Sequence, residues 1–392
     1  MRSFFWHAPS SRRESFGTLT PTSFISSLYF HFPFCESRCH YCDFYALGKE
    51  KMKSEDPLHF EEALHTEIKQ WLPQISPSLD TIFFGGGTPS MTAYDSIAKA
   101  MEPLWKRCSL HAQTEWTMEA NPSSIELNAL RSLRAYGVNR ISLGVQAMQD
   151  PLLQALGRVH TSNKVHEALN VIFEAGFENV SVDLLCGVPS QSESDLESSL
   201  ALVCQFPLTH LSCYLLTLPP HHRLYPDLPE EETQLKHLLL VDQFLQSKNF
   251  EHYEISNFAR AGKKSEHNWR YWKRNSYLGL GPSAHSFDAS TEKRWQNVAS
   301  LRSYAHRLKE GKTSVQFSET LTFEQIELER WMLALRLNEG FPRSWLRLPH
   351  QKEKAEKLQA SGLLEPHPHL EHERLTPRGL ALADQIIPFL LA

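Results

Sequence analysis

Short apolar runs alternate with longer amphipathic stretches along most of this chain. The runs that are rich in β-branched and aromatic side chains predict strands at residues 28–34, 81–84, 115–119, 140–145, 180–186 and 210–216. Helical spacing of apolar positions predicts helices at 60–71, 96–106, 126–136, 164–175 and 193–205. Strands that alternate with helices form βαβ units with parallel strands and right-handed crossovers. Six such units, fewer than the eight of a closed barrel, predict an α/β fold with an open partial (β/α)6 barrel.

The end of the chain has a different pattern. Residues 308–322 are charged and poor in large apolar groups, which predicts a linker. Helical patterns then follow at 323–337, 351–360 and 379–390, with a hairpin-like stretch at 363–375. The sequence therefore predicts a barrel domain at 28–307, with closing strands, and a small winged-helix-like α+β domain at 323–392. Lysines that alternate with glutamates in this domain argue against DNA binding, so a structural or docking role is preferred.

Composition and charge limit the classes of function that the chain can have. The chain has 392 residues, a formal net charge of -5 and seven cysteines. The net charge gives no reason to expect nucleic acid as a partner, and an odd cysteine count favours a reducing, cytoplasmic environment over a disulfide framework. No apolar run is long enough to predict a membrane span. Residues 1–27 are rich in Ser and Thr, and an N-terminal extension is preferred over an organellar transit peptide.

Three cysteines lie within eight residues at Cys35, Cys39 and Cys42, directly after the first predicted strand. Cysteine thiolates are the usual ligands of iron-sulfur clusters, and a 4Fe-4S cluster with three protein ligands keeps one iron open for another ligand. A structural zinc site is the alternative, and it would need a fourth ligand such as His31 or His40. The spacing favours the cluster.

Polar or glycine residues follow most of the predicted strands. A glycine run at 85–87 follows the second strand, and Glu119, Gln146 and Asp183 lie at or near the ends of later ones. The carboxyl ends of parallel strands are where α/β folds bind ligands. Each residue alone has an ordinary explanation as a cap or an ion-pair partner. Together with the cysteine loop, they predict a cofactor site.

With these motifs in this order, the chain resembles the radical S-adenosylmethionine (SAM) superfamily. Within it, the segments at 85–90, 140–146, 156–160 and 210–214 are similar to those of the oxygen-independent coproporphyrinogen III oxidase family. The resemblance covers roughly residues 29–297 and implies a 4Fe-4S cluster on the three cysteines, together with bound SAM. The SAM-binding positions that it implies are Tyr29, Tyr41, Gly86, Gly87, Thr88, Glu119, Gln146, Arg158, Asp183, Thr217 and His285.

Two features separate this chain from the oxidases of that family. The oxidases carry a fourth cysteine two positions after the third, where this chain has Phe44, and they have a longer N-terminal region. The chain instead resembles the heme chaperone branch, which carries a His-Asn-x-x-Tyr motif matched here by His267 and Tyr271. Imidazole and phenolate are both known ligands of heme iron, so these two residues are the predicted heme contacts.

The resemblance implies a protein that binds heme and delivers it to heme-requiring proteins, including membrane-bound acceptors reached by peripheral contact. An electron donor such as flavodoxin or ferredoxin is the further implied partner. Two alternatives stay open: radical decarboxylation of a porphyrinogen propionate, and regulatory heme sensing through the C-terminal domain. The sequence names no catalytic residue and no oligomeric state.

Overall fold

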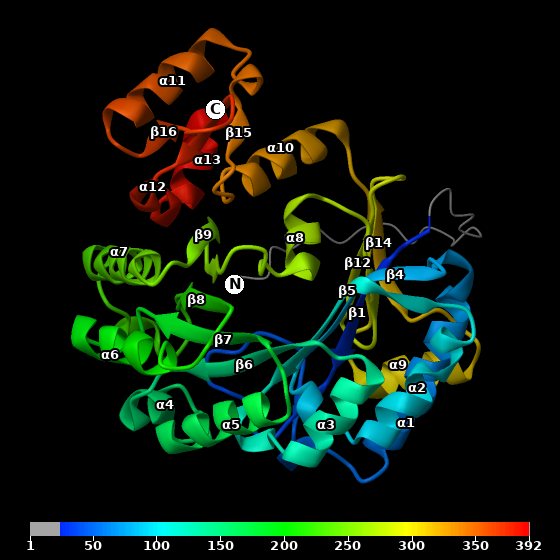
Figure 1. The fold of residues 1–392 in the computed structure, drawn as a ribbon. Helices are drawn as coiled ribbons and strands as arrows, with labels where there is room; N and C mark the ends of the chain where they lie inside the picture. The colour runs from blue at the N-terminus through cyan, green and yellow to red at the C-terminus, as the bar shows by residue number, and fades with distance from the viewer. Residues whose placement is uncertain (1–23, 392) are drawn as a thin grey trace. The chain divides into compact units, whose positions relative to one another are not determined.

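The computed structural model describes residues 24–391, and these residues form two compact units that are each discontinuous in sequence (Figure 1). The first unit comprises residues 24–114 and 276–319, and the second comprises 115–275 and 320–391. Strand β5 (Ser109–Ala120) runs from the first unit into the second. Each unit has its own core and its own set of sequence-predicted site residues.

In the first unit, apolar strands form a parallel ladder. Strand β1 (Ser27–Phe32) pairs in parallel with β4 (Ser78–Gly86) and with β11 (Leu278–Leu280). Phe30, Phe32 and Phe84 are buried there and pack edge to face or tilted, which aromatic rings prefer over direct stacking. The other elements of this unit are β2 (Phe34–Cys35), β3 (Leu47–Gly48), α1 (Asp56–Trp71), α2 (Tyr94–Trp105), β12 (His285–Asp288), β13 (Lys293–Asn297), α9 (Leu301–Lys309) and β14 (Val315–Thr320).

A buried carboxylate ties the discontinuous parts of the first unit together. Glu67 of α1 is fully buried and accepts hydrogen bonds from the Gly281 amide at 2.7 Å, the Asn297 side chain at 2.7 Å, the Tyr304 hydroxyl at 2.6 Å and the Ser314 hydroxyl at 2.5 Å. These four donors offset the cost of burying the carboxylate. Glu67 therefore fastens the segment 281–314 to α1.

In the second unit, strands β5, β6 (Arg140–Gln146), β7 (Asn179–Cys186) and β8 (His210–Leu215) are parallel neighbours. Strand β10 (Asn257–Ala259) adds antiparallel to β8, and β9 (Glu251–Glu254) pairs with β10. Helices lie along the outside of these strands (Figure 1). They are α3 (Leu127–Tyr136), α4 (Asp150–Ala155), α5 (Ser162–Glu174), α6 (Glu193–Val203) and α7 (Glu231–Ser247).

The C-terminal part of the second unit has its own apolar core around Trp331, Phe341 and Leu390. It is joined to β9 through backbone hydrogen bonds from Ile255 to Arg336 and from Asn338 to Tyr253. Its elements are α10 (Phe323–Ala334), β15 (Phe341–Pro342), α11 (Pro349–Ala360), β16 (Leu364–Pro366), β17 (His372–Leu375), α12 (Pro377–Ala381) and α13 (Ala383–Leu391). The sheet order β15-β17-β16 with flanking helices matches the predicted winged-helix-like pattern.

The six predicted strands and the five predicted helices all exist, but three details were wrong. Pro33 ends the first strand at Phe32, because proline lacks the N–H that a ladder needs. The predicted linker at 308–322 contains the end of α9 and strand β14, whose neighbour Ser314 is buried against Glu67. The predicted final helix at 379–390 is two helices, α12 and α13.

The predicted N-terminal extension at 1–27 lies mostly outside the described residues. Within the described part, Ile25 is buried and forms a parallel bridge with Ile75, so the folded unit begins before residue 28. Among the helices between residues 24 and 391, none is long and apolar enough to cross a membrane. The predicted domain boundaries stay a prediction.

Candidate functional site

The three cysteines lie on one loop of the first unit. Cys35 is the last residue of β2, and the loop returns through β3, which pairs in parallel with β2. Inside the loop the Cys42 amide donates to the Cys39 carbonyl at 3.3 Å, and all three cysteines are partly exposed. The Thr88 hydroxyl reaches the Cys35 sulfur at 3.6 Å. The backbone therefore holds the three thiols near one another at the loop's surface.

The three thiols carry the ligand chemistry of an iron-sulfur cluster. Within residues 24–391, no group of three or more His, Cys, Asp or Glu side chains is arranged around a single metal-ion position. In a 4Fe-4S cluster each thiolate binds a different iron atom, so the sulfurs do not need to meet at one point. Burial raises the pKa of the Cys42 thiol to about 11, and neighbouring Cys39 and Cys35 act in the same direction. Metal binding must therefore supply the energy that deprotonates it.

The glycine run at 85–87, at the end of β4, holds the cysteine loop. The Gly87 amide donates to the Phe32 carbonyl at 2.7 Å, and the Thr88 amide donates to the Phe34 carbonyl at 2.6 Å. A Cβ atom on Gly87 would lie 2.6 Å from the Phe34 carbonyl oxygen, so only glycine permits this close approach. Both amides are therefore engaged within the protein and hold the glycine run against the cysteine loop.

Tyr29 lies in a small polar cluster that the sequence reading did not identify. Its hydroxyl contacts Nδ1 of His31 at 3.1 Å, and Nε2 of His31 contacts the Tyr45 carbonyl at 2.7 Å. Because a carbonyl only accepts, Nε2 carries the proton and Nδ1 accepts from Tyr29. Burial lowers the pKa of His31 to about 4, and burial with neighbouring His31 and Arg294 lowers that of His285 to about 4. Both imidazoles are neutral at physiological pH.

The period-two spacing of Tyr29 and His31 along a strand was the available signal for this cluster, since alternate strand residues share a face. Gly86, whose φ is 105°, also contacts the cluster: a Cβ there would lie 2.6 Å from the His31 ring. His31 therefore orients Tyr29 and limits what can stand at position 86. Tyr41 is half-buried in the cysteine loop.

In the second unit, Arg158 is fixed at the carboxyl end of β6. Its guanidinium donates to the Asn121 side chain at 2.5 Å and to the Gly144 carbonyl at 2.6 Å. Gln146 is buried and adopts a left-handed φ of 71°, where β6 ends. Asn121 follows β5 directly and was not among the predicted site residues, although it stands at a strand end. The geometry presents a guanidinium that suits a carboxylate, as the resemblance implied.

Asp183 occupies the same face as two serines on neighbouring strands. Its carboxylate oxygens accept from the Ser142 hydroxyl at 3.2 Å each, and Ser212 bonds it from β8. Burial raises the pKa of Asp183, against the effects of Ser212, Arg140, Ser142 and Arg158. The carboxylate is preorganised as an acceptor, which suits a ribose hydroxyl.

Two predicted SAM positions differ in their surroundings. Glu119 is half-buried near the end of β5, where strand register pairs it with Ser142 of β6. Thr217 is exposed after β8, and its hydroxyl bonds only locally, to the Leu215 carbonyl at 3.4 Å. Thr217 and His285 were both assigned by spacing through variable segments of the sequence.

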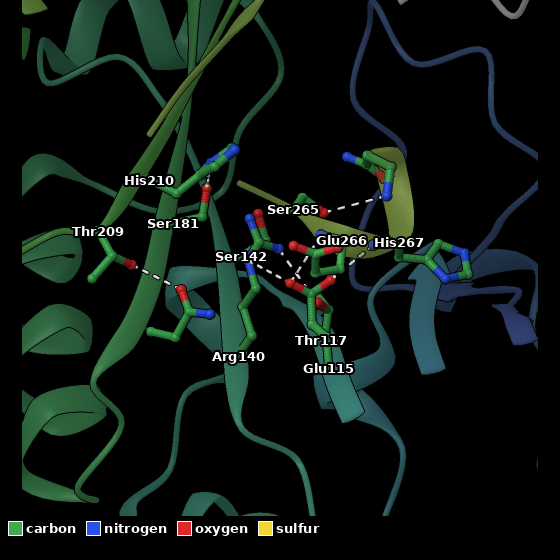
Figure 2. A network of polar contacts seen from close by, with 12 residues as sticks. Glu115, Thr117, Arg140, Ser142, Ser181, Thr209, His210, Ser265, Glu266 and His267 are labelled. Atoms are coloured by element: carbon green, nitrogen blue, oxygen red, sulfur yellow. Dashed lines mark hydrogen bonds and ion pairs between the residues drawn. The ribbon is translucent and has the colours of Figure 1, made fainter. Parts of the chain in front are cut away.

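The His-Asn-x-x-Tyr motif forms helix α8 (Glu266–Trp272), which is anchored on a carboxylate from β5 (Figure 2). Glu115 accepts the backbone amides of Glu266 and His267 at 3.1 Å each, and the Arg140 side chain approaches it at 4.0 Å. Ser265 caps the helix by accepting the Asn268 amide. A carboxylate at a helix N-terminus is favoured both by the free amides and by the helix dipole.

His267 itself is buried. Figure 2 shows its ring pointing away from Arg140 and Glu115, and its Nε2 contacts the Tyr271 hydroxyl at 2.7 Å. Burial lowers the pKa of His267 to about 3, with Arg270 and Arg140 acting in the same direction. The imidazole is therefore neutral, which is the form that ligates metals.

The network that holds the predicted heme residues lies at the amino end of β6, whereas Arg158 and Gln146 lie at its carboxyl end. Arg140 is the first residue of β6 and lies in the network under α8, whereas Gln146 is the last residue of the same strand. His210, the first residue of β8, belongs to the same amino-end network through Ser181 and Tyr253 (Figure 2). Arg158 is therefore at the other end of β6 from the network under His267, and Asp183 lies between them on β7, where both Arg140 and Arg158 act on it.

Comparison with known proteins identifies the family of the chain. Residues 29–203 match the radical SAM superfamily. The chain is 35% identical over 326 residues to the heme chaperone HemW of Bacillus subtilis, covering 81% of this chain and 84% of that protein. It is 32% identical to the heme chaperone HemW of Mycobacterium tuberculosis, covering 93% and 94% of the two chains.

The solved structure of the coproporphyrinogen III oxidase HemN from Escherichia coli has the same fold, with a TM-score of 0.79 at 23% identity over 94% of this chain and 90% of that one. The fold is thus the α/β partial barrel of radical SAM proteins, a superfamily that implies a 4Fe-4S cluster and SAM. The HemW relatives are matched over most of their own length as well as over most of this one. The chain belongs to the heme chaperone HemW family of radical SAM proteins.

Proposed function

We propose that this protein is a heme chaperone: it binds heme and delivers it to heme-requiring proteins, including membrane-bound ones reached by peripheral contact. The observation that carries the proposal is the two-way coverage of the heme chaperone relatives, 84% and 94% of whose lengths the chain spans. Phe44 in place of a further cysteine after the cluster motif supports the chaperone reading over the oxidase reading. Cytoplasmic location is part of the same proposal.

In this proposal Cys35, Cys39 and Cys42 hold the cluster, and an electron donor such as flavodoxin or ferredoxin reduces it. The cluster and SAM would together supply radical chemistry once the cluster is reduced. The protein's own residues bind and orient SAM: Arg158, held by Asn121 and Gly144, faces a carboxylate, and Asp183 accepts from hydroxyls. The remaining proposed SAM contacts are Tyr29, Tyr41, Gly86, Gly87, Thr88, Glu119, Gln146, Thr217 and His285.

Heme contact is assigned to His267 and Tyr271, and their geometry sets a condition on it. The hydrogen bond between the Tyr271 hydroxyl and His267 occupies Nε2 of His267, and α8 is held by Glu115 at its start. Lys273 and Arg274, at the end of α8, form ion pairs with Glu339 and Glu329. Iron ligation through Nε2 of His267 therefore requires the hydrogen bond between the His267 and Tyr271 side chains to break. Tyr271 is half-buried and is the more accessible of the two.

The test is a hemin titration of the anaerobically reconstituted protein, followed by absorption, with coproporphyrinogen III consumption measured in parallel. We expect saturable heme binding and no turnover. Tyr271→Phe and His267→Ala should change the absorption bands, while His369→Ala, which removes an exposed imidazole from the C-terminal hairpin, should not. Sustained turnover without heme binding would reverse the assignment in favour of the oxidase.

A further inference from the structure

A row of polar side chains crosses the second unit on one face of its sheet. Strand register pairs Gly144 with Asp183, Asp183 with Ser212, Ser212 with Asn257 and Asn257 with Glu254. Directly paired residues on neighbouring strands project to the same face. The row therefore extends from the proposed SAM-binding residue Asp183 to the sheet edge at β9.

The outer half of this row is buried without being satisfied. Glu254 and Asn257 are both 0% exposed. Oε1 of Glu254 and both amide atoms of Asn257 have no hydrogen-bond partner within residues 24–391, whereas Oε2 of Glu254 accepts the Ser256 amide at 3.3 Å. A buried polar atom without a partner costs about 1–3 kcal/mol. Two adjacent side chains with this cost indicate groups kept for a ligand.

The chemistry of the pair favours a ligand that accepts hydrogen bonds. Burial raises the pKa of Glu254 to about 8, against the effects of the Ser256 amide and the Asn257 side chain, so the carboxyl is mostly protonated at neutral pH. The pair then offers the O–H of Glu254 and the N–H groups of Asn257 without a formal negative charge. Hydrogen bonds from such donors to an ionised carboxylate are charge-assisted and strong.

Neighbouring charges are compatible with a carboxylate here. Asp183 is offset by Arg140 and Arg158, which both act to lower its pKa. Other titratable or charged groups near Glu254 lie on its own strand, or on elements in contact with that strand or with this row. They are Tyr253 on β9, Tyr214 on β8, Glu119 on β5, the Asp242–His252 pair between α7 and β9, and Arg336 with its partner Asp384.

We propose that Asn257 and Glu254 form a carboxylate-binding subsite that takes a propionate of the tetrapyrrole. The proposal rests on the proposed function, and it specifies which part of the ligand this face of the sheet recognises. Asn257 donates from Nδ2, and the protonated Glu254 donates from Oε1. Tyr214, which is two residues after Ser212 on β8 and so shares its face, borders the subsite.

The experiment compares binding of heme and of heme dimethyl ester, which has no free carboxylate, to the reconstituted full chain. The unmodified protein should bind heme about tenfold more tightly than the ester, and the preference should decline as the pH rises through about 8. Asn257→Leu should lose the preference by weakening heme binding about tenfold while leaving the ester unaffected. Glu254→Gln, which keeps a donor, should retain the preference and lose its pH dependence.

Folding is controlled in the same series. Asn257→Leu removes an unsatisfied buried amide, so its thermal stability should equal or exceed that of the unmodified protein. Equal binding of heme and ester by the unmodified protein, or an unchanged preference in Asn257→Leu, would overturn the subsite while leaving heme binding intact. Loss of all binding in Glu254→Gln would overturn it in favour of a cationic ligand. If neither tetrapyrrole binds the unmodified protein, the chaperone function fails and the subsite fails with it.

Discussion

Glu67 should be the most sensitive single position for the stability of the first unit. Two of its four donors are fixed in direction, the Gly281 amide and the Asn297 side chain, while the Tyr304 and Ser314 hydroxyls can rotate. In Glu67→Gln the new NH2 group must face one fixed N–H, which costs about 2 kcal/mol. Glu67→Ala removes all four acceptor contacts, and we expect a loss of about 4 kcal/mol after water partly replaces them.

The loss should also depend on pH. Burial raises the pKa of Glu67 in the folded protein, even though its four hydrogen bonds act against this. A carboxyl whose folded pKa is raised contributes stability that is present below the unfolded pKa and is lost as the pH rises through the folded pKa. The advantage of the unmodified protein over Glu67→Gln should therefore be largest near pH 4 and shrink at higher pH.

Urea unfolding followed by tryptophan fluorescence measures this, because Trp71 and Trp295 are stacked at 5.3 Å within the same unit. The control is Glu62→Gln, an exposed residue on the same helix, which should change the free energy of unfolding by less than about 0.5 kcal/mol. If Glu67→Ala cost no more than this control, or if the difference between the unmodified protein and Glu67→Gln did not depend on pH, the account of Glu67 as the fastening point would be wrong.

Four further outcomes follow from the site geometry. Cys39→Ala should remove the 4Fe-4S absorption and lower the amount of bound iron, whereas Cys204→Ala, which lies outside the cysteine loop, should keep both. A full cluster in Cys39→Ala would contradict the assignment of Cys39 as a cluster ligand. Gly87→Ala should lower cluster occupancy, because its Cβ would lie 2.6 Å from a carbonyl oxygen of the cluster strand, and unchanged iron content would count against this. Asp183→Ala should weaken SAM binding about tenfold in equilibrium dialysis while iron content stays constant, and equal affinity would remove Asp183 from the site. Glu115→Gln should accelerate amide hydrogen exchange in the first turn of α8, since two backbone N–H groups lose a charged acceptor; unchanged exchange would show that the helix is held elsewhere.

The sequence predicted most of the fold because buried parallel strands are apolar runs that local patterns reveal. It failed where local signals were weak. Strand β14 has only Val315 and Phe317 as large apolar residues, so its sequence resembles a linker. Helix α4 is too short to show a helical period. The role of Glu67 depends on partners more than two hundred residues away, which no local pattern indicates.

The candidate site was predicted in part for a similar reason. The family resemblance identified Arg158 and Asp183, and parallel α/β sheets bind ligands near the carboxyl ends of strands such as the one that contains Asp183. Ser142 lies beside Asp183 on the neighbouring strand β6, but a serine in the sequence does not by itself indicate a binding site. The burial of His267 could not be foreseen, because it depends on Glu115, which lies 152 positions earlier in the chain.

Delivery of heme is the central claim, and the rate of transfer to a heme-free acceptor tests it most directly. The reconstituted protein is loaded with heme and mixed with increasing amounts of an apo heme enzyme, and recovery of that enzyme's activity is timed. A chaperone hands over heme within a complex, so the transfer rate should rise with acceptor concentration beyond the rate at which a passive scavenger removes heme. A rate that is independent of the acceptor and equal to the rate of release to the scavenger would contradict the account.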